Sequence, residues 1–143
     1  MTYLQKITNI AILALASTTI ALHAQSSTPV ATGVFHGQVH STSGRASIYK
    51  GSEGKLVLRL TGFKTSNGPD VHVLLIDAKD AQDNDNFLTN KTERVELGKI
   101  KGNEGDQNYD IPAGTDLAKF RTVAIYCERF NATFGALLLR SSN

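Results

Sequence analysis

From residue 33 onward the chain consists of short apolar or alternating runs, each followed by a turn signal. In the segment 55–63, leucines occupy every second position, which predicts a strand with one buried face. The segment 71–76 is almost continuously apolar and rich in β-branched residues, as expected of a central strand. Between them, Asn-Gly-Pro at 67–69 favours a turn, because Asn-Gly tolerates positive φ and proline cannot extend a strand ladder. This spacing predicts an all-β fold, an antiparallel β-sandwich of eight or nine strands with little helix.

The first 24 residues have the features of a secretory signal peptide. Lys6 precedes an apolar stretch at 10–22, and Ala24 supplies a small residue before the expected cleavage point. The apolar stretch is interrupted by polar residues and is shorter than the roughly 20 residues of a spanning helix, so no transmembrane segment is expected in the mature chain. Residues 25–32 are then expected to be a disordered lead-in, and 33–143 a single domain. These features predict an exported protein, periplasmic or extracellular.

Composition argues against several classes of function. The net charge is +2, with acidic and basic residues scattered along the chain, so no binding to nucleic acid is expected. The sequence has no nucleophile elbow, no paired-carboxylate cleft and no phosphate-binding glycine loop, which leaves open whether the protein is an enzyme. With one cysteine it cannot form an internal disulfide, so packing must hold the domain together.

Cys127, the only cysteine, ends the run TVAIYC. A period of two puts Val123, Ile125 and Cys127 on one face, and such an apolar face is typical of a core. Free cysteine is often a buried, inert hydrophobic residue. Glu128 and Arg129 follow at once, however, so Cys127 lies at a strand end where access is easier, and a nearby arginine favours the thiolate. A reactive thiol, an inert core residue and an intermolecular disulfide therefore all stay open.

The histidines do not form a recognisable metal constellation. His36 and His40 would lie ~13 Å apart on a regular strand, too far for one ion, and His72 points away from the face of the two valines beside it. The chain has no second cysteine for zinc and no C-x-x-C-H motif for covalent haem. The loop after Cys127 contains neither the histidine nor the methionine that a blue-copper site usually places there. We expect no metal site, and copper is disfavoured as a cofactor.

Non-covalent haem stays open as a cofactor. Cys127 as thiolate, or a histidine, could supply an axial ligand, and Phe130 and Phe134 could form the walls of a binding pocket. A chain of this length would have to open its sandwich to make such a cavity, and aromatic residues near a strand corner are more often part of the core. The absence of any cofactor is therefore an equal alternative.

Several motifs along the chain resemble those of the electron-transfer DM-thirteen domain family. Residues 97–135 read LGKIKGNEGDQNYDIPAGTDLAKFRTVAIYCERFNATFG, with Gly-x-x-x-Gly before Tyr-x-Ile-Pro and a lone cysteine on the penultimate strand. Upstream, Gly-Pro-Asp at 68–70 precedes a strand, and the resemblance covers about residues 33–140. It implies a β-sandwich related to haem-binding extracellular domains. It also implies redox chemistry at Cys127, as a free thiol or as a ligand of a prosthetic group.

One position departs from the family pattern. Where the family is expected to have FGxA, this chain has the run FGAL at 134–137, so Leu137 occupies space that a group beside Cys127 would need. We hypothesise an extracytoplasmic redox or electron-transfer role centred on Cys127, with a redox or envelope protein as the partner. The alternative is a non-catalytic binding or structural module of the same compartment, in which Cys127 is inert and buried.

Overall fold

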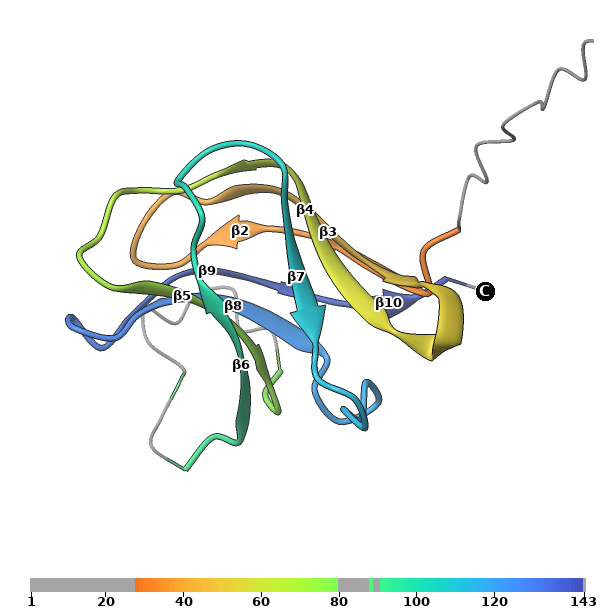
Figure 1. Cartoon of the computed structure of the whole chain (residues 1–143). Helices are drawn as coiled ribbons and strands as arrows, with labels where there is room; N and C mark the ends of the chain where they lie inside the picture. Colours follow the sequence, from red (N-terminus) through yellow and green to blue (C-terminus); the bar gives the residue numbers. More distant parts are fainter. Residues whose placement is uncertain (1–27, 80–87, 89–90, 143) are drawn as a thin grey trace, which may run out of the picture.

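The structure is a computed structural model that describes residues 28–79, 88 and 91–142. Ten strands form two five-stranded antiparallel sheets that pack face to face (Figure 1), which confirms the predicted all-β sandwich. The first sheet has the order β10-β1-β3-β4-β7 and the second β2-β9-β8-β5-β6. The strands are β1 (Ala31–Val34), β2 (His36–Gly37), β3 (Ser43–Lys50), β4 (Leu56–Lys64), β5 (Val71–Ile76), β6 (Arg94–Lys99), β7 (Gln107–Ile111), β8 (Thr122–Cys127), β9 (Ala132–Leu138) and β10 (Arg140–Ser141).

The short elements explain the difference from eight or nine predicted strands. β2 and β10 have two residues each, too few to produce a recognisable alternation. β1 begins at Ala31, so the first sheet includes the last two residues of the segment assigned to the lead-in. The predicted signal peptide lies outside the described residues. Within the described ranges, no helix is long and apolar enough to cross a membrane.

The space between the sheets is filled by side chains from alternate strand positions. Leu58 and Leu60 of β4 are fully buried there, which confirms the alternation predicted for this strand. Residues of β5 and β8 meet them from the opposite sheet. Phe35 lies where the chain passes from β1 in one sheet to β2 in the other, and its ring centroid is 5.4 Å from that of Phe63. One apolar core therefore joins both sheets.

β8 is buried along its whole length because both of its faces are covered. Val123 and Ile125 face the opposite sheet. Ala124 and Tyr126 face outward and pack with residues of β5 and with Leu88, which comes from the segment after β5. Double burial of this kind explains why the sequences of β5 and β8 are almost continuously apolar.

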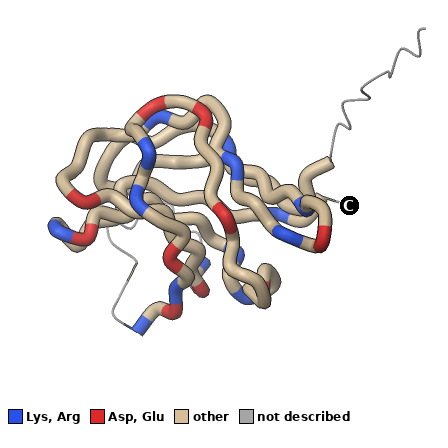
Figure 2. Tube along the Cα trace, in the orientation of Figure 1, with Lys and Arg blue, Asp and Glu red and all other residues tan. Residues whose placement is uncertain are grey.

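Charged residues of both signs are interspersed along the described chain (Figure 2). Ion pairs on the surface include Arg59 with Asp106 at 2.9 Å and Lys64 with Glu104 at 3.1 Å. Such exposed pairs contribute at most about 1 kcal/mol each. The fold therefore depends mainly on the core and on the strand ladders.

Gly135 of β9 is predicted to tolerate no side chain. A Cβ on Gly135 would lie 2.3 Å from the Cβ of Thr42, and Thr42 is held in place by a 2.9 Å hydrogen bond between its hydroxyl and that of Thr65. Gly135→Ala should lower the free energy of unfolding by about 1–3 kcal/mol in urea denaturation. Gly51→Ala is the matched control, since the nearest atom to its Cβ is 3.6 Å away and its φ is −85°. Equal losses of stability in the two variants would contradict this account.

Candidate functional site

Cys127 is the last residue of β8, and its side chain is 0% exposed. In the sheet it pairs with Val71 of β5 on one side and with Ala132 of β9 on the other. Its side chain belongs to the cluster between the sheets together with Val123 and Ile125, so the predicted core face is confirmed. In the resting fold the thiol is surrounded by apolar groups and shielded from solvent.

A short turn, residues 128–131, connects β8 to β9 at the left of Figure 1. Its residues are exposed, and Phe130 is 59% exposed. The backbone N–H of Glu128 donates to the carbonyl of Asp70 at 2.9 Å, and the Tyr126 hydroxyl donates to the side-chain oxygen of Asn131. Cys127 therefore lies directly before an exposed turn, which these two hydrogen bonds join to Asp70 and Tyr126.

The two phenylalanines considered as pocket walls are separated in the structure. Phe134 is 0% exposed and belongs to the same core cluster as Cys127, whereas Phe130 lies at the surface. Phe134 is the extra residue of a β-bulge between Thr133 and Gly135. Because a bulge interrupts the alternation of side chains, the ring of Phe134 can join the core without changing the direction of its neighbours.

Leu137 lies away from the cysteine. It pairs with Val123, four residues before Cys127 along β8, which corresponds to ~13 Å at ~3.3 Å per residue. Leu137 is buried in the core between the sheets, and Ala136 alternates with it on the outer face. The departure from the family pattern therefore changes packing near the end of β8 opposite Cys127 and does not fill the space beside the thiol.

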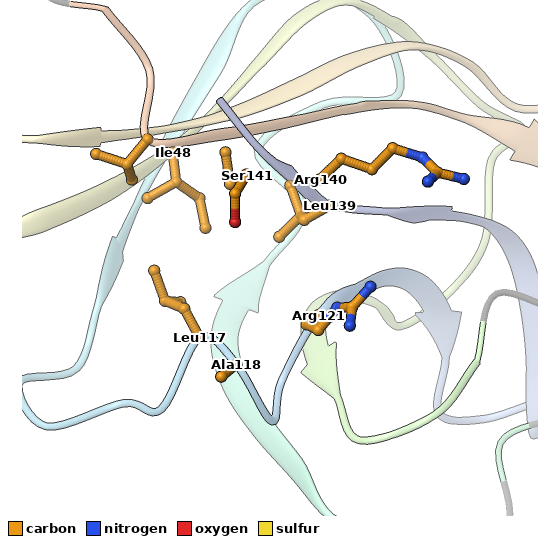
Figure 3. Close-up of a pocket in the computed structure, with 9 residues that line it drawn as sticks. Ile48, Leu117, Ala118, Arg121, Leu139, Arg140 and Ser141 are labelled. Atoms are coloured by element: carbon orange, nitrogen blue, oxygen red, sulfur yellow. The ribbon is translucent and has the colours of Figure 1, made fainter. Parts of the chain in front are cut away.

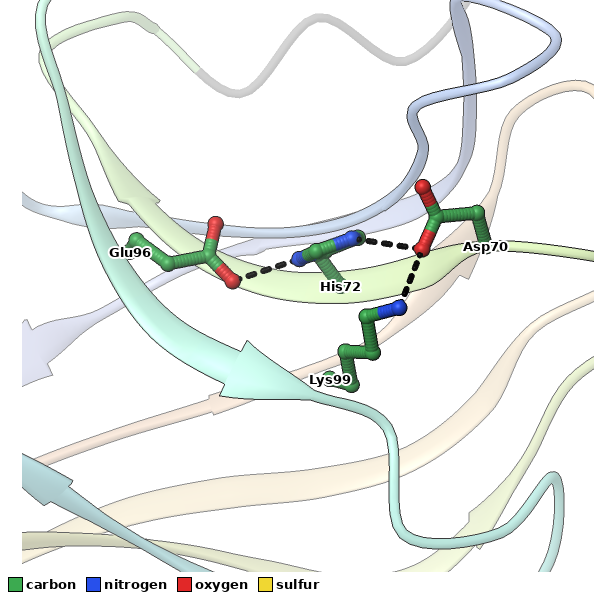
Figure 4. Close-up of polar contacts among 4 residues, drawn as sticks. All are labelled: Asp70, His72, Glu96 and Lys99. Carbon is green, nitrogen blue, oxygen red and sulfur yellow. Dashed lines mark hydrogen bonds and ion pairs between the residues drawn. The ribbon is translucent and has the colours of Figure 1, made fainter.

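A polar cluster that the sequence analysis did not identify lies on the outer face of the second sheet (Figure 4). His72 Nδ1 is 2.6 Å from Glu96 Oε1, and its Nε2 is 2.9 Å from Asp70 Oδ1. Lys99 Nζ is 3.1 Å from the same oxygen of Asp70. An ionised carboxylate can only accept, so these two contacts favour the protonated form of His72, in which both ring nitrogens donate. The cluster also ties β5 to the edge strand β6.

The charges of this cluster stabilise one another. Burial by itself lowers the pKa of His72, but its hydrogen bonds with Glu96 and Asp70 favour the protonated form and together raise the pKa above its usual value. Hydrogen bonds with Lys99 and His72 lower the pKa of Asp70. Asp70 and His72 lie two positions apart, so the sequence could have indicated that they share a face. Glu96 and Lys99 join them only through the register of β5 with β6.

The histidines and the cysteine do not converge. β5 and β8 are neighbours, but His72 pairs with Tyr126 on the outer face while Cys127 faces inward. The His40 ring packs edge-on against Phe134, with centroids 4.3 Å apart. In the described part of the chain, no group of three or more His, Cys, Asp or Glu side chains is placed to hold a metal ion. Cys127 and His72 cannot ligate one metal or haem, because the sheet separates them.

Comparison with known families identifies the domain. A family profile described as "Electron transfer DM13" matches residues 34–139. The chain belongs to the electron transfer DM13 family. This membership confirms the resemblance seen in the sequence and gives the DM13 domain a general electron-transfer role. No curated protein and no solved structure matches the chain.

The Gly-Pro-Asp motif of this DM13 domain supports the end of β8 that carries the cysteine. A Cβ on Gly68 would lie 2.6 Å from Val71 Cγ2 and 3.0 Å from the ring of Phe134, so only glycine fits beneath that ring. The Asp70 carbonyl accepts the hydrogen bond from Glu128, and its carboxylate belongs to the cluster of Figure 4. One motif therefore contacts the core, the turn over Cys127 and the outer polar cluster.

The Tyr-x-Ile-Pro motif has a structural role away from the cysteine. The hydroxyl of Tyr109 donates to Gln107 Oε1 at 2.6 Å and accepts from the backbone N–H of Lys101 at 3.1 Å. Gln107 Nε2 donates in turn to the carbonyl of Gly102 at 2.7 Å. Burial raises the pKa of Tyr109, since its effect exceeds that of the Lys101 hydrogen bond. The motif thus closes the connection between β6 and β7.

Replacing His72 is predicted to lower the free energy of unfolding only at pH values at which its side chain is protonated. Because the pKa of His72 is raised in the fold, its contribution is fully present below the ordinary value of 6.5 and is lost as the pH rises through the folded-state value. Asp70 has a lowered pKa, so its own contribution is lost only at pH below 3.8 and stays constant in this range. His72→Gln should therefore lower the free energy of unfolding by about 1 kcal/mol near pH 5.5 and by much less near about pH 9. Urea denaturation at both pH values checks this, and a cost that does not change with pH would contradict it.

Proposed function

We propose that this DM13 domain transfers electrons outside the cytoplasm through the thiol of Cys127. The family supports the general electron-transfer role, and the signal-like residues 1–24 favour an exported protein. The observation that carries the assignment to Cys127 is its position. The only thiol of the chain is the last residue of β8, directly before an exposed turn, and we infer that a local opening at this strand end would bring it to solvent.

A single thiol restricts the chemistry. Since the chain has no second cysteine, Cys127 can enter a disulfide only with a sulfur from outside the chain, and we propose that a partner protein supplies it as a disulfide. The thiolate of Cys127 attacks one sulfur of that disulfide, so that an S–S bond forms between the two proteins and the partner's own S–S bond breaks. The second sulfur of the partner leaves as a thiolate, and the proton of Cys127 passes to water. Cys127 is thereby oxidised and the partner's leaving sulfur is reduced.

Burial of the thiol makes the turn at 128–131 the gate to this reaction. The Glu128 N–H donates from the turn to the carbonyl of Asp70, and the Tyr126 hydroxyl donates to the side chain of Asn131 in the turn. Breaking them would uncover Cys127, while the core contacts of Val123 and Ile125 further along β8 stay in place. The closed turn would protect the thiol from oxidation between encounters with the partner, since buried cysteines react slowly.

The second candidate function is a non-catalytic binding or structural module of the same compartment. The observation that favours it is that Cys127 is 0% exposed within the apolar core. In that case the cysteine is a small hydrophobic residue, and it reacts only when the whole domain unfolds. The two functions differ in how the thiol becomes accessible, which can be measured.

Alkylation of the native protein by iodoacetamide distinguishes the two functions. With a local gate, the rate of labelling at Cys127 should hardly change at low urea concentration, because opening the turn exposes little surface. Tyr126→Phe removes the hydroxyl that bonds Asn131 and should increase the labelling rate by about fivefold, as expected for one hydrogen bond. Intact mass follows the labelling, and oxidised glutathione in place of iodoacetamide should give a mixed disulfide at Cys127.

Two controls make the outcome decisive. Cys127→Ser should give no adduct with either reagent. Tyr49→Phe removes a hydroxyl on β3, remote from the turn, and should leave the labelling rate of Cys127 unchanged. A labelling rate that rises with urea concentration as steeply as global unfolding does would reject the gate and support the structural module. The absence of a glutathione adduct under conditions where iodoacetamide reacts would reject thiol–disulfide exchange.

A further inference from the structure

Asp70 joins the outer polar cluster (Figure 4) to the turn that follows Cys127. Its carboxylate oxygen Oδ1 is 2.9 Å from His72 Nε2 and 3.1 Å from Lys99 Nζ. Its backbone carbonyl accepts the N–H of Glu128, the first residue of the turn, at 2.9 Å. The side chain and the main chain of one residue thus contact two different parts of the domain, so a change in the cluster is transmitted to the turn through Asp70.

The contact between Glu128 and Asp70 continues the ladder between β5 and β8. His72 lies opposite Tyr126, and one step closer to the strand end Cys127 pairs with the first residue of β5. The next step is the hydrogen bond from Glu128 to Asp70. Loss of that bond would therefore begin to separate β8 from β5 at the position of the thiol.

The proton of His72 decides whether both of its ring contacts can exist. A protonated imidazole donates from both nitrogens, whereas a neutral one has a single N–H and keeps only one of its two carboxylate partners. The contact to Glu96 is the shorter, 2.6 Å against 2.9 Å to Asp70. We therefore expect the neutral ring to keep Glu96. The lone pair of Nε2 then faces Oδ1 of Asp70, and the two repel each other.

The elements packed against His72 carry further titratable or charged side chains, namely Asp70, Arg94, Glu96, Lys99, Tyr126 and Glu128. Arg94 lies over the ring of Tyr126, 5.7 Å from its centroid. Lys99 does not depend on the proton of His72 and stays beside Asp70. The carboxylate of Asp70 therefore loses one of its two partners when His72 becomes neutral, which loosens Asp70 without releasing it.

We propose that His72 and Asp70 are positioning residues for the turn at 128–131, and that this turn opens more readily once His72 has lost its proton. The coupling stands on the hydrogen bonds just described, and its consequence for Cys127 rests on the proposed redox function. Because the pKa of His72 is raised in the fold, the turn is held fully below the ordinary value of 6.5 and loosens as the pH rises through the folded-state value. Alkaline conditions would thus expose the thiol and also favour its thiolate.

Solvent exchange of the Glu128 amide, measured by NMR on the ¹⁵N-labelled protein, tests the coupling. Its protection factor compares the exchange rate with that of an unfolded chain at the same pH. This factor should fall about fivefold between about pH 5.5 and about pH 9, as expected for the loss of one hydrogen bond. In His72→Gln, whose side chain does not titrate, the factor should be low at both pH values. Low urea should hardly change it, because a local opening exposes little surface.

Two controls separate this effect from a general one. The Gly51 amide donates to the carbonyl of Lys55 at 2.7 Å in the turn between β3 and β4, and its protection factor should not change with pH. His36→Gln removes a histidine from the opposite edge of the second sheet and should leave the behaviour of Glu128 unchanged. A Glu128 protection factor that is independent of pH in the wild type would overturn the proposal. An equal fall in His72→Gln, or a parallel fall at Gly51, would also overturn it.

Asp70→Asn provides a second variant, because it keeps the backbone carbonyl and removes the charged carboxylate. It should lower the protection factor of Glu128 near about pH 5.5 as much as His72→Gln does, and the double variant should show no further loss. Additive losses in the double variant would contradict a shared route through Asp70. The amide spectrum of each variant verifies its fold.

Labelling of Cys127 by iodoacetamide separates the coupling from the proposed function. The ratio of the labelling rates in His72→Gln and in the wild type largely removes the ionisation of the thiol itself. It should be about five near pH 5.5 and about one near pH 9. A ratio of one at both pH values, together with a pH-dependent protection factor at Glu128, would support the coupling and reject the turn as the gate to Cys127. Labelling through a local opening with no pH dependence at Glu128 would support the gate and reject the coupling.

Discussion

The hydrogen-bonded ladder between β5 and β8, which runs from the pair Val71 and Cys127 to the pair Ile76 and Thr122, holds the middle of the second sheet. Both strands are apolar on two faces, so one face packs against the opposite sheet and the other needs a cover. Leu88 provides part of that cover. The strict alternation along this ladder determines which side chains are buried in the sandwich and which reach the outside.

This alternation separates the two chemically interesting groups of the domain. Cys127 faces the core, while His72, on the neighbouring strand, faces outward into a cluster of two carboxylates and a lysine. A thiol and an imidazole on one face could have formed a ligand pair, but here a sheet lies between them. In our proposal the thiol therefore acts without a histidine beside it. This is why our account of the function depends on access to Cys127 rather than on its neighbours.

The two ends of β8 differ in the residues that surround them. At one end, the turn at 128–131 is hydrogen-bonded to the Gly-Pro-Asp motif, whose glycine makes room for the ring of Phe134. At the other end, Arg121 directly precedes β8, and a cavity there (Figure 3) is lined by residues of the first sheet and of the segment between β7 and β8.

The sequence by itself determined the class of fold and the inner face of Cys127, because both follow from alternation at positions two residues apart. It also determined that the domain has one thiol, and its motifs indicated the DM13 family. The tertiary structure alone decided that Glu96 and Lys99 meet Asp70 and His72, since this depends on the register of β5 with β6. It likewise decided that Phe134 joins the core at the β-bulge while Phe130 lies at the surface. It also brought Ala31, Ile48 and Leu139 together at one cavity. Local patterns encode the direction of a side chain within a strand, but the neighbours of that strand are chosen by packing between segments that lie far apart in the chain.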